Sequence, residues 1–260
     1  MVTVQTIPDL KVSVGMVSST APKVGEDFVK IAELILENLK KEKNKLDSSK
    51  IEPVIVGLHK TEKIENLKMA YKLLLESHKA GHRFNLETIE CTIIGLHKQN
   101  LFQEAALLLE ETTAALPELK PETIAVTVFM LQDTNCFEEA FSLYKTAIEN
   151  WVQFPENLIE GTVLGFIRGK CLNAARDSVL MALEAGLILK KREAIECTAI
   201  ELKRKKKFAD AYLVLKTALE KGIRPTDGTI NATVIDLRRA RYYNESNDLY
   251  RIAIAKDYKI

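Results

Sequence analysis

The sequence of 260 residues lacks several features that mark common classes of protein. Aromatic residues make up 7% of the chain, with a single tryptophan, and there are only four cysteines. No CxxC pair occurs, so neither a disulfide framework nor a zinc site is predicted. The charges nearly cancel, at 37 basic against 36 acidic residues, so no strong net charge draws the whole chain to nucleic acid or to a membrane surface.

Long apolar runs are also missing. No uncharged apolar stretch approaches the roughly 20 residues that a bilayer-spanning helix needs, so we expect no membrane-spanning segment. Residues 1–24 contain no arginine and no apolar core, and they resemble neither a secretory signal nor an intact organellar presequence. Removal of a presequence before this start stays open.

Sequence motifs for catalysis are absent. The chain has no GxGxxG, no P-loop, no HExxH and no GxSxG, and its acidic residues are scattered. We therefore predict that it is not an enzyme, and we expect no cofactor, no metal and no small-molecule substrate.

What the chain does contain is a period of about 35 residues. A small residue recurs at intervals of 35, 35, 35, 36 and 35 residues, at Ala70, Ala105, Ala140, Ala175, Ala211 and Ser246. A threonine stands 13 residues before each of the last five anchors, at Thr92, Thr127, Thr162, Thr198 and Thr233. Such a period is typical of helical solenoids. We predict an all-α fold, an α-solenoid of helix-turn-helix repeats that forms a right-handed superhelix of about thirteen helices.

Local signals divide each repeat into two helices. Breaks between the first and second helix are predicted at 99–100, 134–135, 169–170, 205–207 and 241–243. Pro121 and Pro155 are predicted to be first helical residues, and Asn85 and Asp227 to be N-caps. The anchor alanine is expected on the second helix, where its methyl group lets the pair approach closely. The threonine is expected inside the first helix, with its hydroxyl bonded to a carbonyl one turn earlier.

These signals predict three parts along the chain. Residues 1–24 are predicted to be an irregular arm, and residues 25–50 a capping helix followed by a charged linker. Residues 51–260 are predicted to form six repeats, of which the last is truncated. The cysteines at 91 and 197 share one repeat position and those at 136 and 171 share another, so they are expected to be small packing residues in a reducing compartment.

Several segments carry a family resemblance. The second helices begin with FQEAALLLEE (102–111), FEEAFSLYKT (137–146) and FADAYLVLKT (208–217), and three units close with KAG, EAG or EKG. Together with the threonine and the period, these segments resemble the pentatricopeptide repeat; the tryptophan and tyrosine pattern of the 34-residue tetratricopeptide repeat is absent. The resemblance covers residues 51–260. It implies a mitochondrial or chloroplast protein that binds single-stranded RNA along its first helices, about one base per repeat.

The positions that read bases in this family carry other residues here. Fifteen residues before each anchor the family usually has Asn, Thr or Ser, whereas this chain has Glu90, Ala125, Glu160, Glu196 and Asn231. Fifteen residues after each anchor the family usually has Asp or Asn, whereas this chain has Asn85, Lys120, Pro155, Lys190 and Thr226. The preceding position, usually apolar in the family, has Glu87, Glu122, Asn157, Glu193 and Gly228, and its three glutamates would repel a base and its phosphates. We predict no one-base-per-repeat code.

One family feature is retained, a basic residue at the end of the first helix, seven residues before the anchor. It is held by Lys98, Arg168, Arg204 and Arg239, with Asp133 as the exception, and Lys60 holds the equivalent place in the slightly longer first unit. The run Lys203, Arg204, Lys205, Lys206 and Lys207 adds five consecutive charges at one turn. These residues are candidate contacts to an RNA backbone, although a cation at a helix C-terminus also has a purely structural role.

Two functions follow as hypotheses. The missing base code, the balanced charge and the arm at 1–24 favour a scaffold or adaptor subunit of a large organellar assembly, such as a ribosome or a membrane-protein supercomplex. Its partners would be protein subunits, contacted through the arm. The alternative is a factor that binds single-stranded RNA or rRNA, supported by residues 187–241, which hold fourteen basic and seven acidic residues.

Overall fold

The computed structural model describes residues 24–41, 48–61, 63–113, 119–150, 152, 154–187 and 192–259. Within these ranges it contains thirteen helices and no strand. An N-terminal helix α1 (Val24–Lys41) is followed by six pairs. The first helices are α2 (Ser48–His59), α4 (Leu86–Lys98), α6 (Pro121–Asp133), α8 (Glu156–Arg168), α10 (Glu193–Arg204) and α12 (Asp227–Arg239). The second helices are α3 (Ile64–Lys79), α5 (Phe102–Thr113), α7 (Phe137–Glu149), α9 (Leu172–Glu184), α11 (Phe208–Glu220) and α13 (Tyr243–Ala255).

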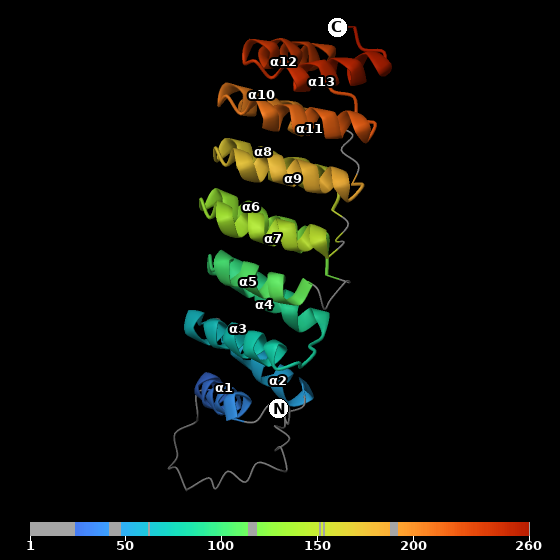
Figure 1. The fold of residues 1–260 in the computed structure, drawn as a ribbon. Coiled ribbons are helices and arrows are strands. Elements are labelled where there is room, and N and C mark those ends of the chain that lie inside the picture. Colours follow the sequence, from blue (N-terminus) through green and yellow to red (C-terminus); the bar gives the residue numbers. More distant parts are fainter. Residues whose placement is uncertain are drawn as a thin grey trace, which may run out of the picture.

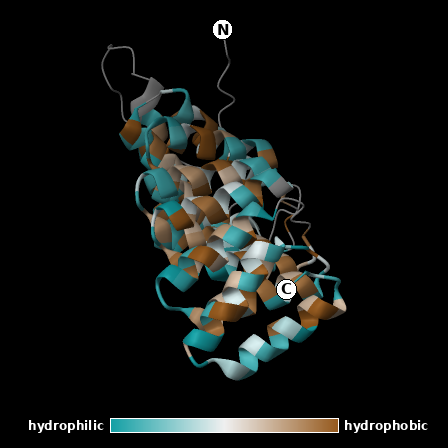
Figure 2. Ribbon diagram, turned by 90° about the horizontal axis from the view of Figure 1, so that it is seen from above, coloured by the Kyte–Doolittle hydropathy of each residue, from teal (hydrophilic) through white to brown (hydrophobic). Residues whose placement is uncertain are grey.

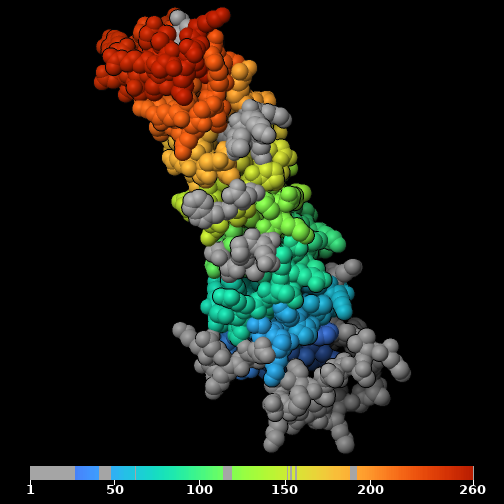
Figure 3. Space-filling model, turned by 90° about the vertical axis from the view of Figure 1, so that its right-hand side faces the viewer, coloured from blue at the N-terminus to red at the C-terminus, as the bar shows by residue number. Residues whose placement is uncertain are grey.

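The helix pairs stack in the order of the sequence to form an elongated array (Figures 1 and 3). Each second helix packs against its own first helix and against the second helix of the next pair, and most first helices also pack against the next first helix. Both apolar and polar residues occur along the helices (Figure 2). The apolar residues that recur every three or four positions face the core, and the polar residues between them face solvent. The predicted all-α solenoid is confirmed.

The recurring small residues and threonines lie where the period predicts. All six anchors are fully buried on second helices. The threonine hydroxyls are buried and return a bond to the carbonyl four residues earlier, at 2.8 Å for Thr92, 2.9 Å for Thr127, 2.6 Å for Thr198 and 2.7 Å for Thr233. Burial of these hydroxyls therefore leaves no donor unsatisfied.

The turn inside each of the last five pairs has one geometry. Its central residue adopts a left-handed backbone, with φ between 58° and 68°, at Asn100, Asn135, Lys170, Lys206 and Arg241. The amide of the following residue then bonds back to the first helix, as Cys136 N does to the carbonyl of Leu131 at 2.8 Å. This conformation closes the first helix in a single residue and starts the second helix at once. The predicted breaks are confirmed.

Several boundaries differ from the sequence prediction. Asn85 caps α4 as expected, since its side chain accepts the amide of Thr88. The N-cap of α12 is Thr226 rather than Asp227, because the threonine hydroxyl accepts the amide of Thr229 and Asp227 is already helical. Pro121 is the first residue of α6, but Pro155 is the N-cap of α8 and precedes its first helical residue.

The N-terminal region agrees in outline. The capping helix is α1, and it packs against α2 and α3. The predicted linker is shorter than expected, because α2 already begins at Ser48. Residues 42–47 and the predicted arm up to residue 23 lie outside the described residues. Cys91 is exposed and the other cysteines are half-buried, so they are not core residues. Cys91 and Cys197 lie within α4 and α10, whereas Cys136 and Cys171 are the N-caps of α7 and α9.

Candidate interaction surface

The basic row lies at one end of the first helices. Lys98, Arg168, Arg204 and Arg239 are the last residues of α4, α8, α10 and α12, and Lys60 directly follows α2. All five are exposed, and only Arg204 has an ion pair within the described chain, to Glu201 one turn earlier. Because the first helices stand side by side, the five cations share one edge, with Asp133 on α6 as the gap.

The run at residues 203–207 does not form one cluster. Lys203 has a side chain only 10% exposed and pairs with Asp236 of α12, at 3.2 Å between Nζ and Oδ2. Lys207 donates from Nζ to Asn173 Oδ1 of α9. Of the five predicted contacts, Lys203 and Lys207 thus bind neighbouring repeats and Arg204 pairs within its own helix. Lys205 and Lys206 are exposed and have no described partner.

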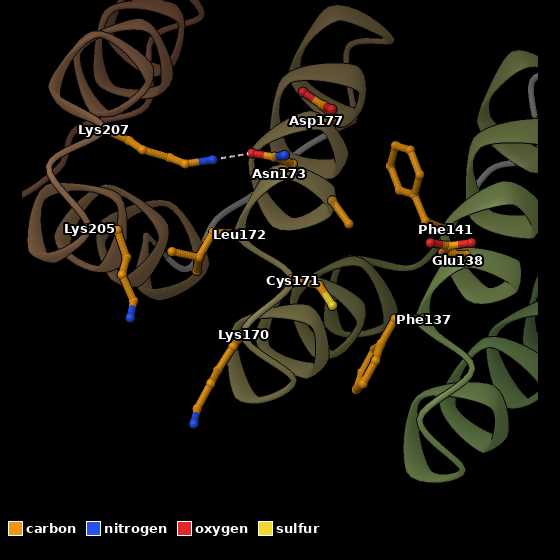
Figure 4. Close-up of a pocket in the computed structure, with 11 residues that line it drawn as sticks. Phe137, Glu138, Phe141, Lys170, Cys171, Leu172, Asn173, Asp177, Lys205 and Lys207 are labelled. Carbon is orange, nitrogen blue, oxygen red and sulfur yellow. Dashed lines mark hydrogen bonds between the residues drawn. The ribbon is translucent and has the colours of Figure 1, made fainter.

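A hollow of about 650 Å³ lies beside this turn, over the N-terminal ends of α7 and α9. Phe137 and Phe141 lie on one side of it, and Lys207, bonded to Asn173, lies on the other (Figure 4). The ring of Phe137 also covers Gly169, where a Cβ would come within 2.2 Å of the ring. A larger residue at 169 would therefore displace the Phe137 ring.

The base-reading positions of the resembled family are used for contacts between repeats. Glu196 of α10 accepts the backbone amide of Thr226, the N-cap of α12. Glu90 of α4 pairs with the Nζ of Lys120, the N-cap of α6, at 3.4 Å. Both carboxylates are largely covered, with side chains 18% and 16% exposed at Glu90 and Glu196. Each of these glutamates therefore connects its repeat to the next one, Glu196 by a hydrogen bond and Glu90 by an ion pair.

The equivalent positions also join the chain to the next segment at both ends of the array, with different hydrogen bonds. In the first unit Glu52 accepts the backbone amide of Asn85 at 2.8 Å and its side-chain amide at 3.3 Å. In the last unit the Asn231 side chain donates to the carbonyl of Lys259 at 3.5 Å. Glu160 is buried on α8, while Lys190 lies outside the described residues. Where Pro155 has no amide to donate, the facing position holds Ala125.

A second set of bonds joins the C-terminal end of one first helix to the middle of the next first helix. His59 Nε2 lies 3.1 Å from the Thr92 hydroxyl, and His97 Nε2 lies 2.9 Å from the Thr127 hydroxyl. In the next unit Gln132 takes the place of the histidine and donates to the carbonyl of Thr162 at 2.9 Å. The duplication of His59 and His97 is thus explained by repeat packing.

The hydrogen bonds of the threonines determine which ring nitrogen of these histidines carries a hydrogen. Each hydroxyl gives its only hydrogen to a carbonyl in its own helix, so it can only accept from the histidine. Each imidazole therefore carries a hydrogen on Nε2 and donates it to the threonine. Burial lowers the pKa of both His59 and His97 below the ordinary 6.5.

This arrangement predicts a pH-dependent stability. Because the folded pKa of each histidine lies below its unfolded value, the unfolded chain binds more protons, and stability falls as the pH drops below about 6.5. The double variant H59Q/H97Q should keep both donors, as Gln132 does, and should lose this part of the slope. Thermal melts between pH 5.5 and pH 7.5 measure it, and an identical slope in wild type and variant would contradict the assignment.

The exposed face of the first helices carries a row that the sequence analysis did not single out. Eleven residues before each anchor, or at the equivalent place in the first unit, stands a large apolar side chain: Val56, Ile94, Phe129, Leu164, Ile200 and Ile235. Four of them are 36% to 50% exposed, namely Val56, Ile94, Ile200 and Ile235. The repeated spacing of these apolar residues is visible in the sequence, but the neighbouring core positions are apolar as well, so the spacing alone does not identify the row as exposed.

The described residues include two cysteines whose thiol pKa is raised. Burial, followed by the charge of Glu138, raises the pKa of the Cys171 thiol, and Cys197 is shifted in the same direction, so both are weak nucleophiles. No group of three or more metal-ligating side chains occurs there. None of the described helices combines the length and the apolar character that crossing a bilayer requires.

Comparison with known proteins adds no relative. The chain matches no family model, and no curated protein sequence is significantly similar to it.

Proposed function

We propose that the chain is a non-catalytic, pentatricopeptide-like scaffold or adaptor subunit of a large organellar assembly, such as a ribosome or a membrane-protein supercomplex. The observation that carries the proposal is the use of Glu52, Glu90 and Glu196 as links between repeats. In the resembled family this position faces a base, whereas here it is covered and acidic. The organellar location rests on the resemblance, and the arm at 1–24 is the proposed route to protein partners.

Binding of single-stranded RNA is the second candidate. It is favoured by the exposed cations at the ends of the first helices and by Lys170, Lys205 and Lys207 around the hollow with Phe137 and Phe141. Aromatic side chains beside cations are typical of sequence-independent binding to single strands. The two acidic groups of the same hollow, Glu138 and Asp177, weaken this case.

The triple variant R168E/R204E/R239E separates the two candidates. A tagged copy expressed in the source cells should co-sediment with a large protein assembly, and the triple variant should remain in it. Deletion of residues 1–24 should release it. Under the RNA alternative the purified protein binds oligo(U) with a log–log salt slope of about −0.7 per neutralised phosphate, and the triple variant loses binding. Tight RNA binding at physiological salt, together with no co-sedimenting protein, would overturn the proposal.

A further inference from the structure

Two of the first helices, α4 and α10, share one order of chemistry along their exposed stripe. On α4 it runs Glu87, Cys91, Ile94 and Lys98, with spacings of four, three and four residues that keep all of them on one side. On α10 the same places hold Glu193, Cys197, Ile200 and Arg204. Each helix thus presents an acid near its N-terminus, an apolar residue in the middle and a base at its C-terminus.

Stacking of the units converts these stripes into three bands along the array. The acidic band holds the exposed Glu87, Glu122 and Glu193, the apolar band holds the row from Val56 to Ile235, and the basic band holds the row from Lys60 to Arg239. On α6 the apolar band is widened by the exposed Val126 and Met130. Hollows of about 370 Å³ and 430 Å³ lie on this face between α2 and α4, lined in part by Val56, Cys91 and Ile94.

The helix dipole accounts for the charged bands but not for the apolar one. Acids at helix N-termini and bases at C-termini are stabilising in any isolated helix. A row of large apolar side chains that are exposed or half-exposed to water has no such benefit, and exposed apolar side chains gathered on one face indicate an interaction site. Phosphates would pair with only one of the three bands and would meet the acidic band as well. The surface is complementary to a partner with charge of both signs and an apolar centre.

From these bands we infer that the first-helix face binds an amphipathic α-helix of another protein subunit, lying along the array. This inference rests on the proposed scaffold function. Packed helices are 8–10 Å apart, and seven residues of a helix advance about 10.5 Å, so an apolar residue every heptad meets one unit after another. On α4 and α10 the acid and the base are eleven residues apart, which is about 16 Å along the helix and enough for one partner helix of about 10–12 Å diameter.

The partner's charges follow from the same geometry. Lysine or arginine on one flank would lie over Glu87, Glu122 and Glu193, and aspartate or glutamate on the other flank over the basic band. Either chain direction can satisfy this, provided that the two flanks carry opposite signs.

The binding test uses a synthetic helical peptide several heptads long, with leucine along its apolar stripe, lysine on one flank and glutamate on the other. Two control peptides carry lysine or glutamate on both flanks. Fluorescence anisotropy with the full chain should give a micromolar Kd for the mixed peptide and at least about tenfold weaker binding for either control. No saturable binding, or equal binding of all three peptides, would overturn the inference.

Matched protein variants locate the site. I94D/I235D changes two apolar-band residues that are 50% and 46% exposed, and L107D/L213D changes two residues of α5 and α11 that are 51% and 43% exposed. Circular dichroism should show both variants folded. The first should bind the mixed peptide at least about tenfold more weakly, and the second should match wild type. Equal loss in both variants would overturn the assignment to this face.

Further outcomes are equally decisive. Oligo(U) binding or self-association of the chain that is abolished by I94D/I235D would overturn the inference by giving the face another occupant. If the tagged wild type and I94D/I235D enter the same cellular assembly equally well, the proposed function stands and this inference fails. If the wild type enters no assembly but the peptide results hold, the proposed function fails alone.

Discussion

Replacing Ala140 by leucine should lower the free energy of unfolding by about 1–3 kcal/mol. Ala140 is fully buried on α7, which packs against α6 in its own unit and against α5 and α9 on either side. The larger side chain has no space between these helices, so α7 must move away from its neighbours. Because each unit is stabilised by adjacent units, the disturbance should reach α5 and α9 as well.

Urea unfolding followed by circular dichroism measures this loss, and hydrogen exchange by mass spectrometry locates it. A140S is the matched control. Serine already stands at the equivalent position 246, where its Oγ donates to the carbonyl of Val234 at 3.0 Å. A serine at 140 has the corresponding carbonyl of Val128 available, so it should cost less than about 1 kcal/mol. Equal stability of A140L and wild type would show that α7 is not closely packed.

The fold could be predicted from the sequence because the same residue types recur at the same positions in each repeat. One buried alanine says little, but six small residues at a common interval define where each second helix touches its partner. The threonine bonds and the turns were predictable for a related reason, since they connect residues within a few positions of one another. The errors at Pro155 and Asp227 concern one residue at a helix end, where neighbouring polar residues compete for the cap.

The candidate site was less predictable, because its contacts join separate units. Glu196 and Thr226 are 30 residues apart, and so are Glu90 and Lys120. Read along the sequence, these glutamates appear only as a departure from the family's base-reading residues. Stacking of the units gives them partners. Lys203 shows the same effect, because its charge looks free in the run at 203–207 and is covered once α12 brings Asp236 beside it.

The exposed apolar row was missed for a different reason. In an amphipathic helix the core and the exposed face both contain apolar residues, and periodicity alone does not separate Ile93, which is fully buried, from Ile94, which is 50% exposed. Only the direction from which the second helix packs decides between them. Once this is known, the repeat registry turns single exposed residues into a continuous surface.

The glutamate links should contribute strongly to the coupling between units. In E196A the amide of Thr226 loses its acceptor, and Arg192 loses the partner that its Nε meets at 3.6 Å. A part-buried donor without an acceptor costs about 1–3 kcal/mol, and the loss should appear as early unfolding of α12 and α13. Thermal melts and hydrogen exchange at α12 measure it.

Two controls separate this link from general effects of charge removal. E196Q keeps an oxygen that can accept the Thr226 amide, so it should retain most of the stability. E193A removes the exposed carboxylate on the same helix, three residues earlier, and should change the free energy of unfolding by less than about 0.5 kcal/mol. If E196A and E193A were equally mild, the position would be free of a structural role and open again to a ligand. We expect E196A but not E193A to uncouple the last unit, because of these two carboxylates only that of Glu196 accepts a part-buried backbone amide.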